Sequence, residues 1–416
     1  MGKGARAVGK PMNSRTKFFV VSTSACLTIL LLVGHVVGKA ASSDDTYKHI
    51  GVFSDVVARI KSEYVEEPDM KSVTLGALNG MLEAIDPFAS YLNADQYKDY
   101  LKNKDVKRAD VGLVLSKKFG FVGVVSAITG SPAAKAGFST GDMIETINGV
   151  ATRDMPLAYA AILLQGDPGS TVEINVFHVR RSEPTTVKLT RAMVPLPTVE
   201  TRVLADNVGY INVDAISPAL VKDIAAAVQK LQADGAKKLM LDLRNCATGS
   251  PEDGIALANL FLNKGRITYL VGQKIARQNF DADPAKAITS LPMTVLTNRG
   301  TAAAAEVAAA ALMDNKRAQA VGERTYGDAA MRRALTMDDG GAIILSVAKY
   351  YSPEGKAIQD NGLTPNYVVT DTDAAVELDD NGEPLPENPT TDTGAQKKVE
   401  NDPIVKKAQE VLAKLG

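Results

Sequence analysis

Residues 238–243 read Lys-Leu-Met-Leu-Asp-Leu, a short run in which apolar residues dominate. A run of this length without polar alternation is typical of a strand buried on both faces of a parallel sheet. An amphipathic helix is expected before it, at residues 218–233, and a second buried strand after it, at residues 293–297. Strands that alternate with helices indicate an α/β fold, and we assign residues 193–373 to this core. Further elements of the same alternation are expected at 209–213 (strand), 255–263 (helix), 302–313 (helix) and 342–347 (strand).

Residues 106–192 have a different pattern, of short strands separated by glycine-containing turns. Residues 121–125 form one expected strand, residues 130–137 a turn with a short helix, and residues 141–149 a strand that ends in Asn-Gly, which favours a tight hairpin. Together these motifs resemble a PDZ domain. The resemblance implies that the C-terminal tail of a protein is added as an extra strand; a small sandwich without a ligand is the alternative. The implied peptide-binding residues are Gly112, Leu113 and Val114.

A basic N-terminal stretch precedes an apolar run from Phe18 to about Val37. About 20 apolar residues are enough to cross the hydrocarbon core of a bilayer, and basic flanks stay on the cytoplasmic side. We therefore expect residues 1–43 to hold a cytoplasmic tail and a transmembrane anchor or signal segment, with the bulk of the chain exported (periplasmic or extracytoplasmic). The length of the run favours an uncleaved anchor, and a signal peptide cleaved near Ala40 is the alternative.

The composition excludes several classes of function. The 416 residues include 47 Lys and Arg against 48 Asp and Glu, and a net charge of -1 does not indicate a nucleic-acid partner. One of the two cysteines lies inside the apolar run, so a disulfide framework is not expected. The three histidines, His35, His49 and His178, are far apart, so neither a metal site nor a Ser-His-Asp triad is expected. No motif implies a cofactor.

Three further segments connect these parts. Residues 44–105 have helical periodicity and predict a small helical bundle. Residues 374–401 are acidic, contain prolines and predict a disordered or extended linker. Residues 402–416 predict a closing helix. Its apolar positions near one face are Ile404, Ala408, Val411 and Leu415.

Four motifs occur in an order that resembles one family. They are residues 80–87 (Gly-Met-Leu-Glu-Ala-Ile-Asp-Pro), 241–245 (Leu-Asp-Leu-Arg-Asn), 321–327 (Val-Gly-Glu-Arg-Thr-Tyr-Gly) and 349–355 (Lys-Tyr-Tyr-Ser-Pro-Glu-Gly). With the PDZ-like segment, they make the chain similar to the carboxyl-terminal processing, or tail-specific, serine peptidases. The resemblance implies a core of the ClpP/crotonase type and a serine activated by a lysine, with a glutamine assisting. It also implies an oxyanion hole built from backbone N–H groups.

The positions that carry this chemistry in the family hold different residues here. The family's serine run, of the type Gly-Ser-Ala-Ser-Ala-Ser-Glu, corresponds to residues 300–306, which read Gly-Thr-Ala-Ala-Ala-Ala-Glu. Its middle serine corresponds to Ala303, the lysine to Asp328 and the glutamine to Arg332. Asp328 follows Ala303 by 25 residues, as the family pattern requires, so the alignment is not shifted. We expect Asp328 and Arg332, four residues apart, to pair with each other.

The loop after residue 245 departs from the family as well. The resemblance places the oxyanion loop at Thr248 and Gly249, with Ala304 beside the serine position, and only the last glycine of the loop is kept. Two other side chains are candidate nucleophiles. Thr301 is expected instead to be an N-cap, and Cys246 a buried thiol without a base.

We therefore predict an exported, membrane-tethered pseudopeptidase that binds protein C-terminal tails through its PDZ domain. An active peptidase relative is a candidate partner. Two alternatives remain open: an active serine-type endopeptidase with a rewired site, and a structural envelope protein whose PDZ domain mediates assembly.

Overall fold

The computed structural model describes residues 44–104, 106, 108–153, 155–179, 183–370 and 399–415. It divides into two compact units, one that ends at Thr74 and one that begins at Leu75. The apolar run expected to be a membrane helix lies outside the described residues. Within the described part of the chain, no helix is long and apolar enough to cross a membrane.

The first unit contains helix α2 (Asp44–Glu63) and the start of α3 (Met70–Glu83). Phe53 and Val56, which lie on the apolar side of α2, are 43% and 49% exposed. The helices expected in residues 44–105 are confirmed, and their packing as a bundle stays a prediction.

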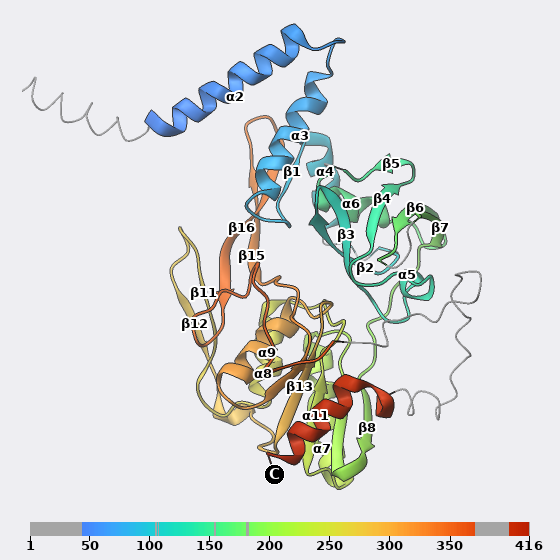
Figure 1. Ribbon diagram of the computed structural model, residues 1–416, viewed down its shortest axis with the longest axis vertical. Helices are drawn as coiled ribbons and strands as arrows, with labels where there is room; N and C mark the ends of the chain where they lie inside the picture. The colour runs from blue at the N-terminus through green and yellow to red at the C-terminus, as the bar shows by residue number, and fades with distance from the viewer. Residues whose placement is uncertain are drawn as a thin grey trace, which may run out of the picture. The chain divides into compact units, whose positions relative to one another are not determined.

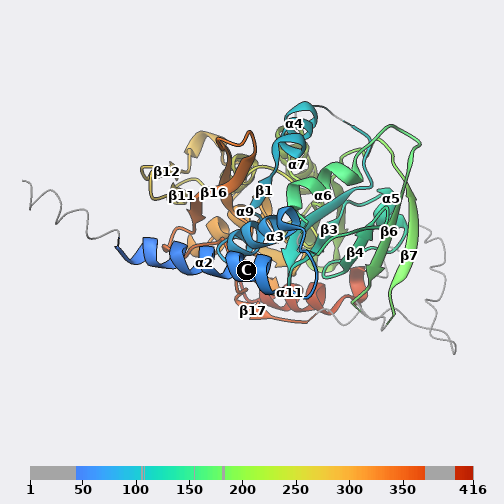
Figure 2. The ribbon, with the colours of Figure 1, turned by 90° about the horizontal axis from the view of Figure 1, so that it is seen from above.

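The second unit contains a PDZ-type sheet in the order β2-β3-β4-β6-β7, in which β5 pairs with β4 (Figures 1 and 2). Helix α6 contacts β2 and β4. Asn148 and Gly149 both have positive φ, 50° and 76°, as a two-residue hairpin turn requires, so the predicted hairpin is confirmed. The elements are β2 (Leu113–Lys118), β3 (Phe121–Ala127), α5 (Pro132–Lys135), β4 (Met143–Ile147), β5 (Val150–Ala151), α6 (Leu157–Leu164), β6 (Thr171–Phe177) and β7 (Thr185–Thr190).

The α/β core contains a six-stranded sheet in the order β17-β14-β13-β10-β9-β8. All neighbours pair in parallel except β8 and β9, which are antiparallel. All residues of β13 are buried, and so are all residues of β10 after Lys238, as their apolar sequences predict. The strands are β8 (Glu200–Leu204), β9 (Val208–Asn212), β10 (Lys238–Asp242), β13 (Met293–Thr297), β14 (Gln319–Gly322) and β17 (Tyr367–Val368).

In the residues that the structure describes, four helices belong to this core, together with two short 3₁₀ turns. Helix α7 starts where Ser217 caps it and Pro218 takes the first position. Helix α8 begins before the predicted residue 255, because Ser250 and Asp253 form a capping box around Pro251. The elements are η2 (Ala205–Asn207), α7 (Pro218–Ala233), α8 (Pro251–Asn259), η3 (Pro284–Lys286), α9 (Ala304–Asp314) and α11 (Pro403–Ala413).

A second sheet connects the segment before the PDZ domain to the core. Its order is β1-β16-β11-β12, with β15 also paired to β16. Strand β1 was not predicted, since it has three residues between helices α3 and α4. Ser90 of β1 pairs with Ile344 of β16, and Figure 1 shows β1 near the long β15–β16 hairpin. The elements are β1 (Ser90–Leu92), α4 (Ala94–Asn103), β11 (Arg266–Val271), β12 (Gln278–Asp281), β15 (Ala330–Thr336) and β16 (Ala342–Tyr351).

The C-terminal helix α11 contacts β13 and β14 and buries one apolar face. Its expected face is correct except for Leu415, which lies beyond the helix and is 44% exposed. Arg244 connects the helix to the sheet, because it forms ion pairs with Asp242 at 2.6 Å and with Asp402 at 2.5 Å. The buried residues of α11 are Ile404, Val405, Ala408, Val411 and Leu412.

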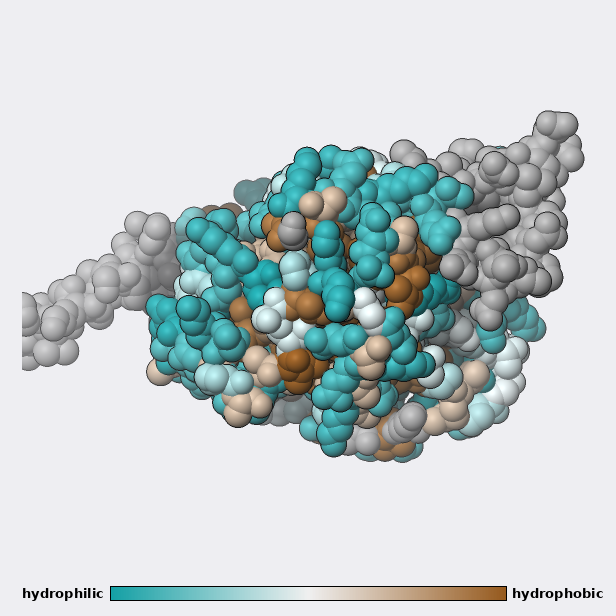
Figure 3. Space-filling model, turned by 90° about the horizontal axis from the view of Figure 1, so that it is seen from below, coloured by the Kyte–Doolittle hydropathy of each residue, from teal (hydrophilic) through white to brown (hydrophobic). Residues whose placement is uncertain are grey.

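The face drawn in Figure 3 is mainly hydrophilic, with small separate hydrophobic areas.

Candidate functional site

Ala303 lies at a sharp turn between β13 and α9. Its backbone has φ 53° and ψ -121°, a conformation that residues other than glycine rarely adopt. It is the N-cap of α9, and no side chain caps the helix. The predicted N-cap role of Thr301 is therefore wrong. Thr301 is instead buried; its hydroxyl donates to the Leu243 carbonyl at 2.8 Å and accepts from the Asn298 N–H at 3.0 Å.

The loop after β10 forms the opposite side of this turn. Gly249 has φ 108°, and a Cβ on it would lie 2.5 Å from the carbonyl oxygen of Ile216 and 3.1 Å from the Cβ of Ala304. Only glycine fits there. The N–H groups of Gly249 and Ala304 have no acceptor among the described residues. The loop and the helix start thus each carry a backbone N–H without an acceptor, the kind of group from which an oxyanion hole is built.

Asp328 and Arg332 are the residues that the resemblance assigns to the positions of the base and its helper. They form an ion pair, as expected from their spacing, and their side chains are 15% and 26% exposed. Burial raises the pKa of Asp328, and the guanidinium of Arg332 counteracts this rise. The guanidinium carbon of Arg332 also lies 4.2 Å from the ring centre of Phe88. Such stacking favours a cation over an aromatic face, so Arg332 is held by the ring as well as by the Asp328 carboxylate, and the pair fills this part of the site.

Glu306, in the first turn of α9, was not predicted from the sequence as a site residue. It is completely buried and accepts hydrogen bonds from the N–H groups of Gly327 and Asp328, both at 2.7 Å, and from the hydroxyl of Thr325. Burial raises its pKa to about 8, against the effect of these donors. The only signal in the sequence was a single carboxylate in an alanine-rich helix. Glu306 connects the turn at Ala303 to the loop that carries Asp328.

Strand β3 of the PDZ-type sheet contacts both loops of the site. Val125 packs with Ala247 and Ala302 in one buried cluster. The Ser126 hydroxyl donates to the Asn245 carbonyl at 2.7 Å. Next to these contacts lies a cavity of about 360 Å³, which Asp214 also lines. The PDZ-type domain is therefore packed directly against the loop after β10 and the turn before α9.

Within the described part of the chain, the thiol and hydroxyls near this turn have no lysine or histidine as a hydrogen-bond partner. Cys246 is completely buried in the core, which confirms the expectation of a buried thiol, and burial raises the pKa of this thiol. The hydroxyl of Ser116 bonds to that of Tyr326, and the hydroxyls of Ser126 and Thr301 donate to carbonyls. None of these three hydroxyls has a lysine or a histidine as its partner in these hydrogen bonds.

The implied peptide-binding residues lie at the start of β2, the edge strand of its sheet. The N–H of Gly112 is not available for a tail, because it donates to the Asp110 carboxylate at 2.7 Å. Leu113 and Leu115 of β2 are half-buried and pack against the core of this domain.

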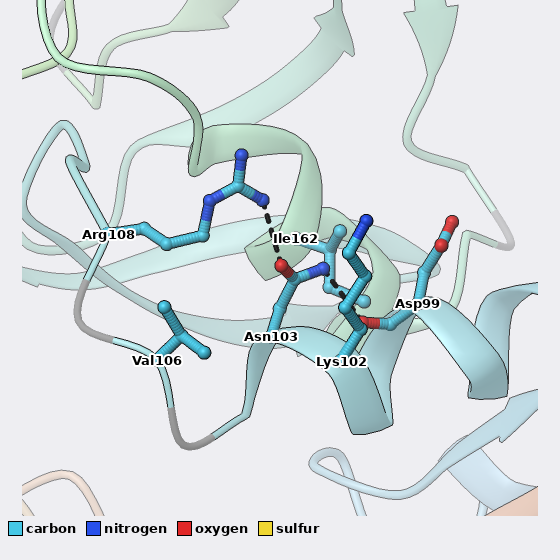
Figure 4. Close-up of a pocket in the computed structure, with 6 residues that line it drawn as sticks. All are labelled: Asp99, Lys102, Asn103, Val106, Arg108 and Ile162. Carbon is cyan, nitrogen blue, oxygen red and sulfur yellow. Dashed lines mark hydrogen bonds between the residues drawn. The ribbon is translucent and has the colours of Figure 1, made fainter.

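A second cavity, of about 420 Å³, lies beside Ile162 of α6 (Figure 4). Arg108 donates to the side-chain oxygen of Asn103 at 2.9 Å there. The cavity is lined by charges of both signs, from Asp99, Lys102 and Arg108, so it has no single preference for the charge of a ligand.

Comparisons with known proteins agree with this architecture. The sequence pattern of peptidase family S41 matches residues 207–369, and that of a PDZ domain matches residues 123–176. The carboxy-terminal-processing protease of Bartonella bacilliformis is 31% identical over 360 residues, which cover 85% of this chain and 82% of the relative. The carboxy-terminal processing protease CtpA of Bacillus subtilis is 31% identical over 358 residues, which cover 84% and 76%.

A solved structure leads to the same family. The photosystem II D1 C-terminal processing protease is similar with a TM-score of 0.64 and 27% identity, over 76% of this chain and 92% of that chain. The fold is thus a mixed α/β architecture with a PDZ domain and an S41 peptidase core. The chain belongs to the carboxy-terminal-processing proteases of peptidase family S41.

Proposed function

We propose that this family member is a pseudopeptidase, which keeps the peptidase fold and binds protein tails without cutting them. The observation that carries the proposal is the methyl group of Ala303 at the nucleophile position, with the Asp328–Arg332 ion pair where a base and its helper are required. Removing the nucleophile alone costs about a millionfold in kcat in a serine peptidase. The two free backbone donors at Gly249 and Ala304 cannot replace it, since they stabilise a tetrahedral oxyanion that no residue here can generate.

The direct test is proteolysis of an unfolded substrate. The purified full chain is incubated with β-casein, beside the variant Ala303→Ser/Asp328→Lys/Arg332→Gln. We expect no fragments from the natural chain. Fragments that disappear when Thr301→Val or Cys246→Ala is introduced would establish a rewired active site and refute the proposal.

Tail binding is the second part of the proposal, and the PDZ domain supports it. PDZ domains add an extended C-terminal peptide to a sheet edge and hold its carboxylate, and β2 is an edge strand. We expect the full chain to retain peptides with a free C-terminus and to lose them when the carboxylate is amidated. Equal retention of both forms would exclude this mode of recognition.

The proposal also includes export and membrane tethering, because the basic stretch and the apolar run from Phe18 to about Val37 precede the peptidase fold. The chain should stay in the membrane fraction after alkaline extraction. In cells whose inner membrane is intact, its PDZ domain should be cleaved by protease added to the outer face. Release into the soluble fraction would indicate that the segment is cleaved instead.

A further inference from the structure

Three acidic side chains lie near one another where β8, β9 and β10 pair. Glu200 and Asp242 are in register with the same residue of β9, and Asp214 follows that residue by two positions. Arg202 lies 3.6 Å from Glu200, and Arg244 lies 2.6 Å from Asp242. Asp214 has no such ion pair with any residue that the structure describes. Its carboxylate is therefore the member of this group whose charge is not neutralised.

Asp214 is half-buried and lies against the PDZ-type domain. Its carboxylate accepts one hydrogen bond from the hydroxyl of Thr129, in the loop after β3, at 2.8 Å and one from the side-chain amide of Asn212 at 3.0 Å. Both donors are neutral, so they do not balance the negative charge. Burial raises the pKa of Asp214, against the effect of these two donors. A bound cation would recover part of the free energy that this burial of a carboxylate costs.

The cavity of about 360 Å³ beside β3 is lined by Asp214 and by hydroxyl groups that can only accept. Ser126, Thr129 and Thr140 are among its lining residues. Each of these hydroxyls donates its single proton to a carbonyl or a carboxylate of the protein, at 2.7 or 2.8 Å. A hydroxyl that has donated its proton can offer a further partner only its lone pairs. The cavity therefore combines an unneutralised negative charge with several hydrogen-bond acceptors.

We propose that this cavity binds a guanidinium group, carried by an arginine side chain of a peptide or protein, with Asp214 as its counter-ion. A guanidinium has five N–H donors and no acceptor, which suits such a lining better than the three donors of an ammonium. It is also less strongly hydrated than an ammonium, so it loses less on entering a partly buried site. The volume of about 360 Å³ falls in the range of about 300–1,000 Å³ that is typical of ligand pockets. This site is separate from the edge of β2 and goes beyond the proposed tail binding.

Lys135 of α5 also lines the cavity and carries a charge of the wrong sign for this ligand. Its side chain is exposed and forms no ion pair within the described part of the chain. The ammonium of such a lysine can stay in water while its methylene groups lie along the rim, and water and salt screen an exposed charge. Lys135→Ala should therefore not weaken the binding of a guanidinium. A loss of binding in this variant would mean that Lys135 holds the ligand and would overturn the proposal.

The test measures binding to the full chain by isothermal titration calorimetry at low salt. The probe is N-acetyl-L-arginine amide, in which the guanidinium is the only charged group. N-acetyl-L-citrulline amide has nearly the same shape without the charge, and tetramethylammonium chloride has the charge without N–H donors. We expect the arginine probe to bind about tenfold or more tightly than either control. Equal affinities, or no binding of the arginine probe, would refute the proposal.

Two further probes test the chemical class of the ligand. N-acetyl-L-lysine amide should bind more weakly than the arginine probe, because it has fewer donors and a more strongly hydrated cation. Equal binding of the two would overturn the choice of a guanidinium. Free L-arginine should bind no more tightly than the blocked probe. A tenfold preference for free L-arginine would assign the cavity to the amino acid and overturn the assignment to a peptide or protein.

Asp214→Asn keeps the size of the side chain and removes its charge, so it should weaken binding of the arginine probe about tenfold or more. The matched control is Asp223→Asn, which removes the same charge from an exposed position of α7 and should leave Kd unchanged. Equal Kd values for the two variants would overturn the role of Asp214. Hydrogen exchange of the wild type needs no variant: the arginine probe should slow exchange in residues 126–140 and 208–216 and not in residues 157–164. Protection of other segments alone would overturn the location of the site.

Discussion

The turn at Ala303 stores strain that glycine would remove. A residue other than glycine at φ 53° and ψ -121° costs about 1–3 kcal/mol. Ala303→Gly removes this cost but adds about 0.4–1 kcal/mol of entropy lost on folding. It also improves the N-cap of α9, where glycine is preferred to alanine. We expect the free energy of unfolding of the core to rise by about 1 kcal/mol.

For a core of this size, that change corresponds to a rise in Tm of about 2–4 °C, which differential scanning calorimetry of the full chain measures. The matched control is Ala310→Gly in the same helix, because Ala310 is 1% exposed and lies in the helix interior. The control should lower the free energy of unfolding by at least about 1 kcal/mol. A decrease in Tm for Ala303→Gly equal to that of the control would show that the turn is not strained.

Three further results are expected. Arg332→Leu leaves the Asp328 carboxylate without its partner, so we expect it to destabilise the core by about 2 kcal/mol in urea unfolding. Adding Asp328→Leu removes the unpaired carboxylate and should recover part of this loss. A double variant that is less stable than Arg332→Leu would contradict this expectation. The pKa of Glu306 is about 8 in the folded chain against a usual 4.5, so the folded chain keeps a proton that the unfolded chain releases. Between pH 5 and 8 the wild type should therefore lose more stability than Glu306→Gln. If the urea midpoints of the two proteins changed in parallel with pH, the raised pKa of Glu306 would be disproved. Cys246 should resist iodoacetamide in the native Cys26→Ser chain and react after unfolding, as mass spectrometry would show; native labelling would mean that the thiol is accessible.

The strands of the core were predictable because a strand buried on both faces has apolar residues at nearly every position. Residues 238–243 contain too few polar positions for an exposed strand, and β10 is buried as expected. Strand β1 has no such pattern, since three residues are too few to show an alternation of apolar and polar side chains. Its partner β16 is distant in sequence, and only tertiary structure brings them together.

The site was predictable in part, for a similar reason. The identities of Ala303, Asp328 and Arg332 follow from aligning motifs, and the pair at i and i+4 follows from their spacing. The stacking of Arg332 on Phe88 is a contact between segments far apart in the chain, which no local pattern reports. Thr301 was assigned wrongly because a hydroxyl before a helix is typical of an N-cap. Here the helix starts later, and the hydroxyl bonds to the end of β10 instead.

The pairing of β1 with β16 has a consequence for synthesis. Ser90 emerges from the ribosome about 250 residues before Ile344. At roughly 5–20 residues per second, the first strand waits on the order of 10–50 s for its partner. During that interval residues 90–92 lack their partner in the β15–β16 hairpin. A truncated chain that stops before the hairpin would therefore leave this segment unpaired, and unpaired strand edges promote aggregation.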